Sequence, residues 1–177
     1  MTKYAALLRG IAPMNPQMRN EKLRAVAQSV GLANVASVIS SGNLVFDTNR
    51  RPEEVEEAME EAWPRLLGFE STTLLRSQAD LEELEELAPF GDLEHGPESY
   101  LLVTFSKYSL PEGTARVDMS DPAVEVVGAT DREIFTVTDT TVREGGLGVM
   151  SRLEAELGKT ITSRTWLTVG RILRKMG

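Results

Sequence analysis

The sequence predicts an α+β protein with a ferredoxin-like (split βαβ) N-terminal lobe, built on an antiparallel sheet and packed on a second α+β lobe. Strand-like apolar runs alternate with amphipathic helical patterns, in the order β-α-β-β-α-β over residues 1–76. The 177 residues, 41% of them hydrophobic, suffice for a sizeable core. No flexible linker interrupts them, so we expect a single domain over residues 1–177 with lobes at about 1–76 and 77–177.

The first predicted elements are a buried strand and an amphipathic helix. Tyr4–Leu8 is an unbroken apolar run, and the Pro- and Asn-containing stretch Ile11–Arg19 predicts a loop. Asn20 is a favourable N-cap residue for the helix that follows, because its side chain can accept a hydrogen bond from the first turn. Gly31 is placed to end that helix.

A hairpin follows the first helix. The short apolar runs Val35–Ser40 and Asn43–Asp47 flank Ser41 and Gly42, residues typical of a turn. In the split βαβ topology the first two strands run in the same direction. The loop after the first strand, the start of the first helix and this hairpin turn should therefore lie at one edge of the sheet.

A long helix and a strand complete the first lobe. Pro52 suits the first position of a helix, and the apolar stripe after it is the clearest helical pattern of the chain. Pro64 is expected to bend or end the last turn of this helix. The β-favouring residues within Glu70–Arg76 then predict a strand.

The second lobe is predicted in the order αβββαα. Its elements are expected at Ser77–Ala88, Tyr100–Phe105, Ala123–Val127, Glu133–Thr138, Val149–Leu157 and Thr165–Met176. The Pro- and Gly-containing stretch Lys107–Pro122 predicts an irregular excursion. Residue identity does not demonstrate a repeat of the first lobe, so an internal duplication stays an open possibility.

The composition excludes several chemistries. The chain has no cysteine and one histidine, which removes disulfides, thiolate nucleophiles and Cys- or His-rich metal sites. We therefore expect no metal and no cofactor. His95 lies in a loop-like stretch, where an exposed imidazole is the expected state. No apolar run approaches the roughly 20 residues of a membrane-spanning helix, and the start of the chain reads as a strand, so we expect a soluble cytoplasmic protein.

Acidic residues dominate the charge. The net charge of −8 disfavours nucleic acid and anionic membranes as partners. Acidic runs at 53–61 and 80–86 are expected to be solvated helix faces. The last helix is basic, with Arg171, Arg174 and Lys175, and it leaves nucleic-acid binding open as a minor alternative.

Polar and basic residues gather at the predicted common edge. Arginines supply positive charge, a helix N-terminus supplies N–H groups, and Ser and Asn side chains supply further hydrogen bonds, a combination suited to an anion. The candidate ligand-binding residues are Arg9, Gly10, Asn15, Arg19, Asn20, Ser40, Ser41, Asn43 and Arg164. The structural alternative is that Arg9 braces the loop, Asn20 only caps the helix, and the Ser and Asn residues form an ordinary turn.

Four stretches carry a family resemblance. Taken together, they resemble the bacterial "domain of unknown function 1697" family across nearly the whole chain. The four stretches are Ala6–Ile11, Asn15–Arg24, Val38–Phe46 and Ile161–Val169. The loop Ala12–Pro16 resembles that of a Met/Asn/Pro-loop subgroup. The resemblance implies membership and no activity, because the family's function is not established.

These observations favour a non-enzymatic protein, monomeric or homodimeric, that binds a small anionic ligand at the Arg9/Ser41 edge. They leave three alternatives open. The first is an enzyme that acts on a phosphorylated or carboxylated small molecule, with a carboxylate base that the sequence does not identify. The second is a module that assembles with a protein through an open sheet edge. The third is the nucleic-acid binder described above, through the basic C-terminal helix.

Overall fold

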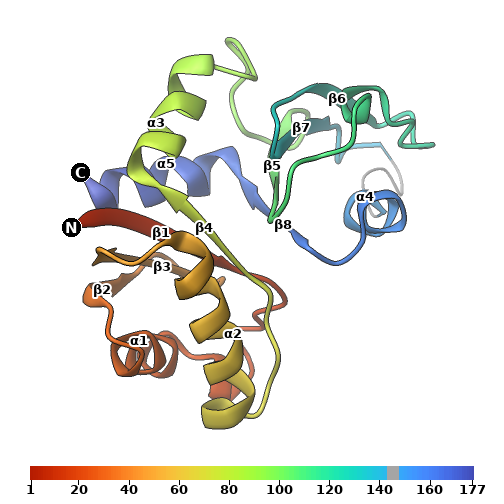
Figure 1. The fold of residues 1–177 in the computed structure, drawn as a ribbon. Helices are drawn as coiled ribbons and strands as arrows, with labels where there is room; N and C mark the ends of the chain where they lie inside the picture. Colours follow the sequence, from red (N-terminus) through yellow and green to blue (C-terminus); the bar gives the residue numbers. More distant parts are fainter. Residues whose placement is uncertain (143–147) are drawn as a thin grey trace. The chain divides into compact units, whose positions relative to one another are not determined.

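The structure is a computed structural model that describes residues 1–142 and 148–177 (Figure 1). The chain divides into two compact units. Unit 1 comprises Met1–Glu83 together with Arg171–Gly177, and unit 2 comprises Leu84–Gly170. Each unit holds a four-stranded antiparallel sheet with helices, which confirms the predicted α+β class. Within the described ranges, no helix has the length and apolar character needed to span a membrane.

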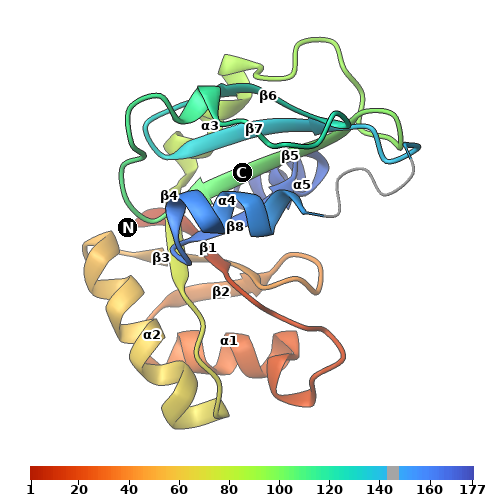
Figure 2. The same cartoon turned by 90° about the vertical axis from the view of Figure 1, so that its right-hand side faces the viewer.

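Unit 1 has the ferredoxin-like topology that the sequence predicts. Its sheet has the strand order β2-β3-β1-β4, and neighbouring strands are antiparallel. Helices α1 and α2 cover one face of it (Figure 2). Its elements are β1 (Thr2–Leu8), the 3₁₀ helix η1 (Pro16–Met18), α1 (Asn20–Ser29), β2 (Ala33–Ser37), β3 (Asn43–Thr48), α2 (Pro52–Leu67) and β4 (Thr73–Ser77), followed by the start of α3 (Gln78–Leu87).

Helix α2 provides the largest side chain of the unit 1 core. Trp63 is fully buried and stacks on Phe69 with ring centroids 6.1 Å apart. Of the two effects predicted for Pro64, a bend or an end of the last turn, the ending is wrong, because the helix runs through Pro64 to Leu67. The end is set instead by Gly68, whose φ of 78° lets its N–H reach the carbonyls of Trp63 and Pro64.

The same helix covers β4, which is an edge strand of the sheet. Glu56 Oε1 accepts from Leu75 N at 2.8 Å, and Glu60 Oε1 accepts from Thr73 N at 2.9 Å. One turn further, Trp63 Nε1 donates to Thr73 Oγ1 at 3.0 Å. The prediction that acids 53–61 all form a solvated face is therefore wrong for these two glutamates. They satisfy outward-facing N–H groups that would otherwise be open to another strand.

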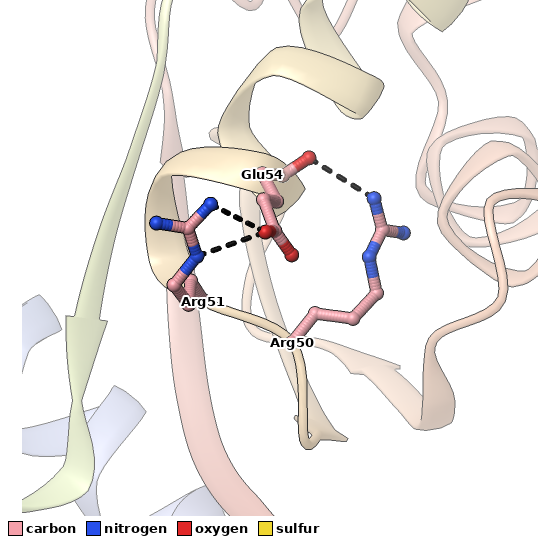
Figure 3. A network of polar contacts seen from close by, with 3 residues as sticks. All are labelled: Arg50, Arg51 and Glu54. Carbon is pink, nitrogen blue, oxygen red and sulfur yellow. Dashed lines mark hydrogen bonds and ion pairs between the residues drawn. The ribbon is translucent and has the colours of Figure 1, made fainter.

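A polar network holds the first turn of α2 (Figure 3). Arg51 donates to Glu54 Oε1 from Nε at 2.8 Å and from Nη2 at 2.6 Å. These bonds lower the pKa of the Glu54 carboxyl and raise the pKa of Arg51. Arg50 donates to Val30 O at the end of α1 and to Glu54 O, so one guanidinium joins the two helices.

Unit 2 contains a strand that the sequence analysis missed. Residues Ile161–Thr165 form β8, so the predicted order αβββαα is corrected to αβββαβα. The segment ITSRT contains one strongly apolar residue, Ile161. It therefore lacks the alternation of apolar and polar residues that predicts a half-buried strand. The elements are β5 (Tyr100–Ser106), η2 (Thr114–Arg116), β6 (Val124–Ala129), β7 (Glu133–Thr138), α4 (Val149–Leu157), β8 and the start of α5 (Trp166–Met176).

With β8 included, unit 2 repeats the topology of unit 1. Its strand order is β6-β7-β5-β8, which is the order of unit 1 when β1 to β4 are replaced in turn by β5 to β8. The register repeats as well. In unit 1 the fourth residue of β1, Ala5, pairs with Arg76 of β4. In unit 2 the fourth residue of β5, Val103, pairs with Arg164 of β8.

Hydrogen bonds at the strand ends repeat in the same way. Arg9 N donates to Thr72 O at 2.9 Å, and in unit 2 Lys107 N donates to Thr160 O at the same distance. The helix after each fourth strand also starts alike, because Ser77 Oγ and Thr165 Oγ1 each accept from the N–H three residues ahead. The two units therefore share the strand order and these contacts, although unit 2 has the three-residue η2 where unit 1 has helix α1.

A cluster of hydroxyl groups, with Thr104 buried and Ser163 half-buried, lies on the α4 side of the unit 2 sheet. Thr104 Oγ1 and Ser163 Oγ are 2.7 Å apart, and Ser163 Oγ donates to Met150 Sδ at 2.6 Å. Thr136 is fully buried in the neighbouring strand β7. Its Oγ1 has no hydrogen-bond partner among the described residues.

We expect Thr136→Val to raise the free energy of unfolding by about 1 kcal/mol, because it removes an unpaired buried hydroxyl at nearly constant volume. Urea unfolding followed through the fluorescence of Trp166, which lies in the same unit, measures the change. Thr104→Val is the matched control, since it breaks an existing hydrogen bond and should lower stability. A loss of stability in Thr136→Val would contradict the prediction.

Candidate anion-binding groove

A groove of about 410 Å³ lies in unit 1 at the edge where the sequence predicts a site. One wall is the end of η1 with the first turns of α1, and the other is the β2–β3 turn. Its lining residues are Pro13, Met18, Arg19, Asn20, Glu21, Arg24 and Ser40. Three of the predicted residues, Arg19, Asn20 and Ser40, are therefore brought together.

Local hydrogen bonds set the approach to α1. Asn15 Oδ1 accepts from Gln17 N at 3.0 Å and caps η1, whose first residue is Pro16. The chain then extends at Arg19, with φ −69° and ψ 145°, and α1 begins at the next residue. Arg19 is thus the N-cap residue by position, and its exposed side chain makes no capping bond.

Two side chains of α1 hold the hairpin against the helix. Asn20 Nδ2 donates to Ile39 O at 2.8 Å, and Arg24 Nη1 donates to Ser37 Oγ at 2.7 Å. The expectation that Asn20 caps the helix is wrong, because the residue is the first of α1 and its side chain is used across the groove. These two bonds fix the separation of the walls.

Side-chain hydrogen bonds hold the turn that carries Ser40. Asn43 is completely buried, and its Nδ2 donates to Val38 O at 3.1 Å and to Ser41 Oγ at 3.0 Å. Ile39 has a φ of 50°, a conformation that costs free energy for a β-branched residue. Its carbonyl is the one that Asn20 holds. The hairpin is therefore kept in one strained conformation beside the groove.

The lining carries a net positive charge. Arg19 and Arg24 bring two guanidinium groups and Glu21 one carboxylate. The N–H groups of Asn20 and Glu21 add partial positive charge at the same place, whereas those of Lys22 and Leu23 already donate to Arg19 O. Arg19 and Glu21 are exposed, whereas Arg24 is half-buried.

The other unit 1 candidates lie outside the lining. Arg9 uses its backbone to brace the loop, with its N–H on Thr72 O and its carbonyl accepting from Ser71 Oγ at 2.7 Å. Gly10 is exposed in a left-handed turn with φ 74°. Asn15 holds the loop, and Ser41 and Asn43 hold the hairpin beside the groove, through their side-chain hydrogen bonds.

Arg164 belongs to unit 2 and is a buried residue of β8. Its Nη1 donates to Thr162 Oγ1 at 2.9 Å and to Ser163 O at 2.8 Å. Burial lowers the pKa of Arg164 to about 10, so the side chain remains charged at neutral pH. Arg76 is its counterpart in unit 1 and likewise donates to the preceding carbonyl, that of Leu75. The repeat indicates a structural role for both arginines.

One lining residue was missed by the sequence analysis. Arg24 lies four residues after Asn20, and residues at that spacing share one face of a helix. Helical periodicity alone could therefore have added Arg24 to the candidates.

Two further side chains lie in unit 2. Trp166 is half-buried and packs edge-to-face on Phe90 at 5.5 Å. His95 is half-buried rather than exposed, because its Nδ1 accepts from Leu101 N at 3.2 Å and its ring lies 4.6 Å from that of Tyr100. In the part of the chain that the structure describes, no three His, Cys, Asp or Glu side chains are grouped to hold a metal ion.

Comparisons with known proteins place the chain in a family. The sequence model of the family described as "Protein of unknown function (DUF1697)" matches residues 1–135. Among solved structures, the conserved bacterial protein SP0830 from Streptococcus pneumoniae is similar at a TM-score of 0.73 and 21% identity, over 99% of this chain and 98% of that one. At this identity the likeness concerns the fold. The search of curated proteins gave no match.

Proposed function

The chain belongs to the DUF1697 family, whose function is unknown, and from this starting point we propose that it binds a small anionic ligand in the groove of unit 1. The ligand would carry a phosphate or a carboxylate group. The observation that carries the proposal is the convergence of Arg19, Arg24 and the start of α1 on one groove. A volume of about 410 Å³ is in the range of small-molecule sites.

Each lining group has a part in this proposal. The exposed guanidinium of Arg19 is available for a bidentate contact with a planar or tetrahedral anion. Arg24 is already oriented by Ser37, so it would lose little side-chain entropy on binding. The N–H groups of Asn20 and Glu21 supply further donors, because those of the next two residues already donate to Arg19 O.

The lining supports binding rather than catalysis. Its one carboxylate, Glu21, is exposed, and nothing in the groove buries it. A general base needs a perturbed environment to act near neutral pH, and none of the seven lining residues is a histidine or a buried acid. We therefore propose a binding protein, with nucleic acid disfavoured by the net charge of −8.

Arg19→Ala is expected to weaken the binding of a phosphate- or carboxylate-bearing compound by about tenfold, because it removes a charge-assisted contact. Thermal shift and isothermal titration with inorganic phosphate, glycerol phosphate and citrate give the affinities. Arg65→Ala is the matched control, since Arg65 is an exposed arginine of the same unit outside the lining. Equal affinities for wild type and Arg19→Ala would contradict the proposal.

A further inference from the structure

Unit 2 has a cavity at the position that corresponds to the groove of unit 1. It measures about 590 Å³ and lies between the connection after β5 and the β6–β7 turn. Its lining residues are Leu110, Pro111, Glu112, Gly113, Thr114, Ala115, Arg116, Ala129 and Thr130. In unit 1 the groove lies between the connection after β1 and the β2–β3 turn. The repeated fold therefore carries a cavity at the same place twice.

The strand register shows that this correspondence is a property of the repeated fold. In unit 1 the sixth residue of β1, Leu7, pairs with Asn43, the first residue of β3. In unit 2 the sixth residue of β5, Phe105, pairs with Glu133, the first residue of β7. Both of these third-strand residues are buried polar groups tied to the turn, Asn43 through Ser41 and Glu133 through Thr130. The two turns are thus anchored at equivalent positions beside their cavities.

The cavity of unit 2 differs from the groove in charge. Its charged lining residues are one acid, Glu112, and one base, Arg116. Both are exposed, and neither side chain has a hydrogen-bond or ion-pair partner among the described residues. The hydroxyls beside them are already used, because Thr114 Oγ1 donates to Pro111 O at 2.6 Å and Thr130 Oγ1 is bonded to Glu133.

From this charge pattern we propose that the cavity of unit 2 binds a small zwitterion. Its carboxylate would pair with Arg116 and its ammonium with Glu112, so that both charges of the ligand are matched. An α-amino acid is the smallest ligand class that carries both groups. The proposal is independent of the anion site in unit 1, where two arginines and one glutamate favour a ligand of net negative charge.

Amide NMR of the full chain, titrated with individual α-amino acids and with inorganic phosphate, tests the proposal. We expect at least one amino acid to shift the amides of Gly113, Arg116 and Thr130 saturably. Arg116→Ala and Glu112→Gln should each weaken that binding by about tenfold. The matched controls are Lys159→Ala and Glu125→Gln, exposed unit 2 residues outside the lining, and they should leave the affinity unchanged.

Three results would overturn the proposal. They are the absence of shifts in these amides with every amino acid, unchanged affinity in Arg116→Ala, and saturation of the cavity by phosphate alone. The same spectra report on the unit 1 groove through the amides of Asn20 and Ser40. Failure at one site is therefore read separately from failure at the other.

Discussion

Gly42→Ala is expected to lower the free energy of unfolding by about 3 kcal/mol. Gly42 has a φ of 78°, which strains any residue that carries a Cβ. An added Cβ would also lie 2.5 Å from Ile11 Cγ1 and 3.0 Å from Leu8 Cβ. The clash comes from the packed start of the unit 1 loop, so the neighbours cannot simply move aside.

Gly68→Ala separates the two causes. Gly68 has the same φ of 78°, but no atom lies within 4 Å of the Cβ that would be added. It should therefore show only the backbone strain, about 1 kcal/mol. Urea unfolding in a Trp166→Phe background, where Trp63 reports on unit 1 alone, measures both variants. If the two variants lost the same free energy of unfolding, the contact of the added Cβ with Ile11 and Leu8 would not contribute to the effect of Gly42→Ala.

The same substitution bears on the groove. Gly42 O accepts from Leu8 N at 2.8 Å, which ties the hairpin turn to the end of β1. A shift of the turn would move Ile39 O away from Asn20 and would open the wall that carries Ser40. Gly42→Ala should therefore weaken phosphate binding along with stability, whereas Gly68→Ala should leave that binding unchanged.

The sequence predicted the structure best where the residues of a single segment determine its secondary structure. The turn at Ser41 and Gly42 and the long stripe after Pro52 were both found, because turn chemistry and helical periodicity are local. The ferredoxin-like order of unit 1 follows from such elements taken in sequence. Three residues of the groove were predicted for the same reason, since the topology brings two local features to one edge.

What the sequence did not reveal depends on contacts between distant segments. Strand β8 is stabilised by pairing with β5, and its own residues are mostly polar. The repeat is visible in strand order and hydrogen-bond register, whereas residue identity does not demonstrate it. Asn20 was assigned to a local cap, while its partner is Ile39, nineteen positions away.

The acidic run after Pro52 carries the second large prediction. Glu56 and Glu57 are neighbours of identical chemistry, but helical spacing places Glu56 beside the apolar stripe that contains Met59 and Trp63, and it places Glu57 on the opposite side of the helix. Treating the whole run as one solvated face missed this difference. In the structure Glu56 is 8% exposed and accepts from Leu75 N, whereas Glu57 faces solvent. The contact with β4 thus divides a uniform acidic run into structural and solvated residues.

Glu56→Ala is therefore expected to cost about 2 kcal/mol, because a backbone N–H of the β4 edge loses its buried acceptor. Glu57→Ala should change stability by less than about 0.5 kcal/mol, as an exposed substitution does. Glu56→Gln keeps an oxygen acceptor, so its loss in free energy of unfolding should lie between those of Glu56→Ala and Glu57→Ala. Trp63 fluorescence in the Trp166→Phe background follows each unfolding transition, since Trp63 also contacts β4 through Thr73.

A second measurement distinguishes edge protection from simple packing. If Glu56 and Glu60 keep β4 from pairing with other strands, the double variant Glu56→Ala/Glu60→Ala should self-associate at concentrations where wild type and Glu57→Ala/Glu61→Ala do not. Size-exclusion chromatography with light scattering detects this. A destabilised double variant that elutes like its control would mean that the two carboxylates stabilise unit 1 without guarding its edge.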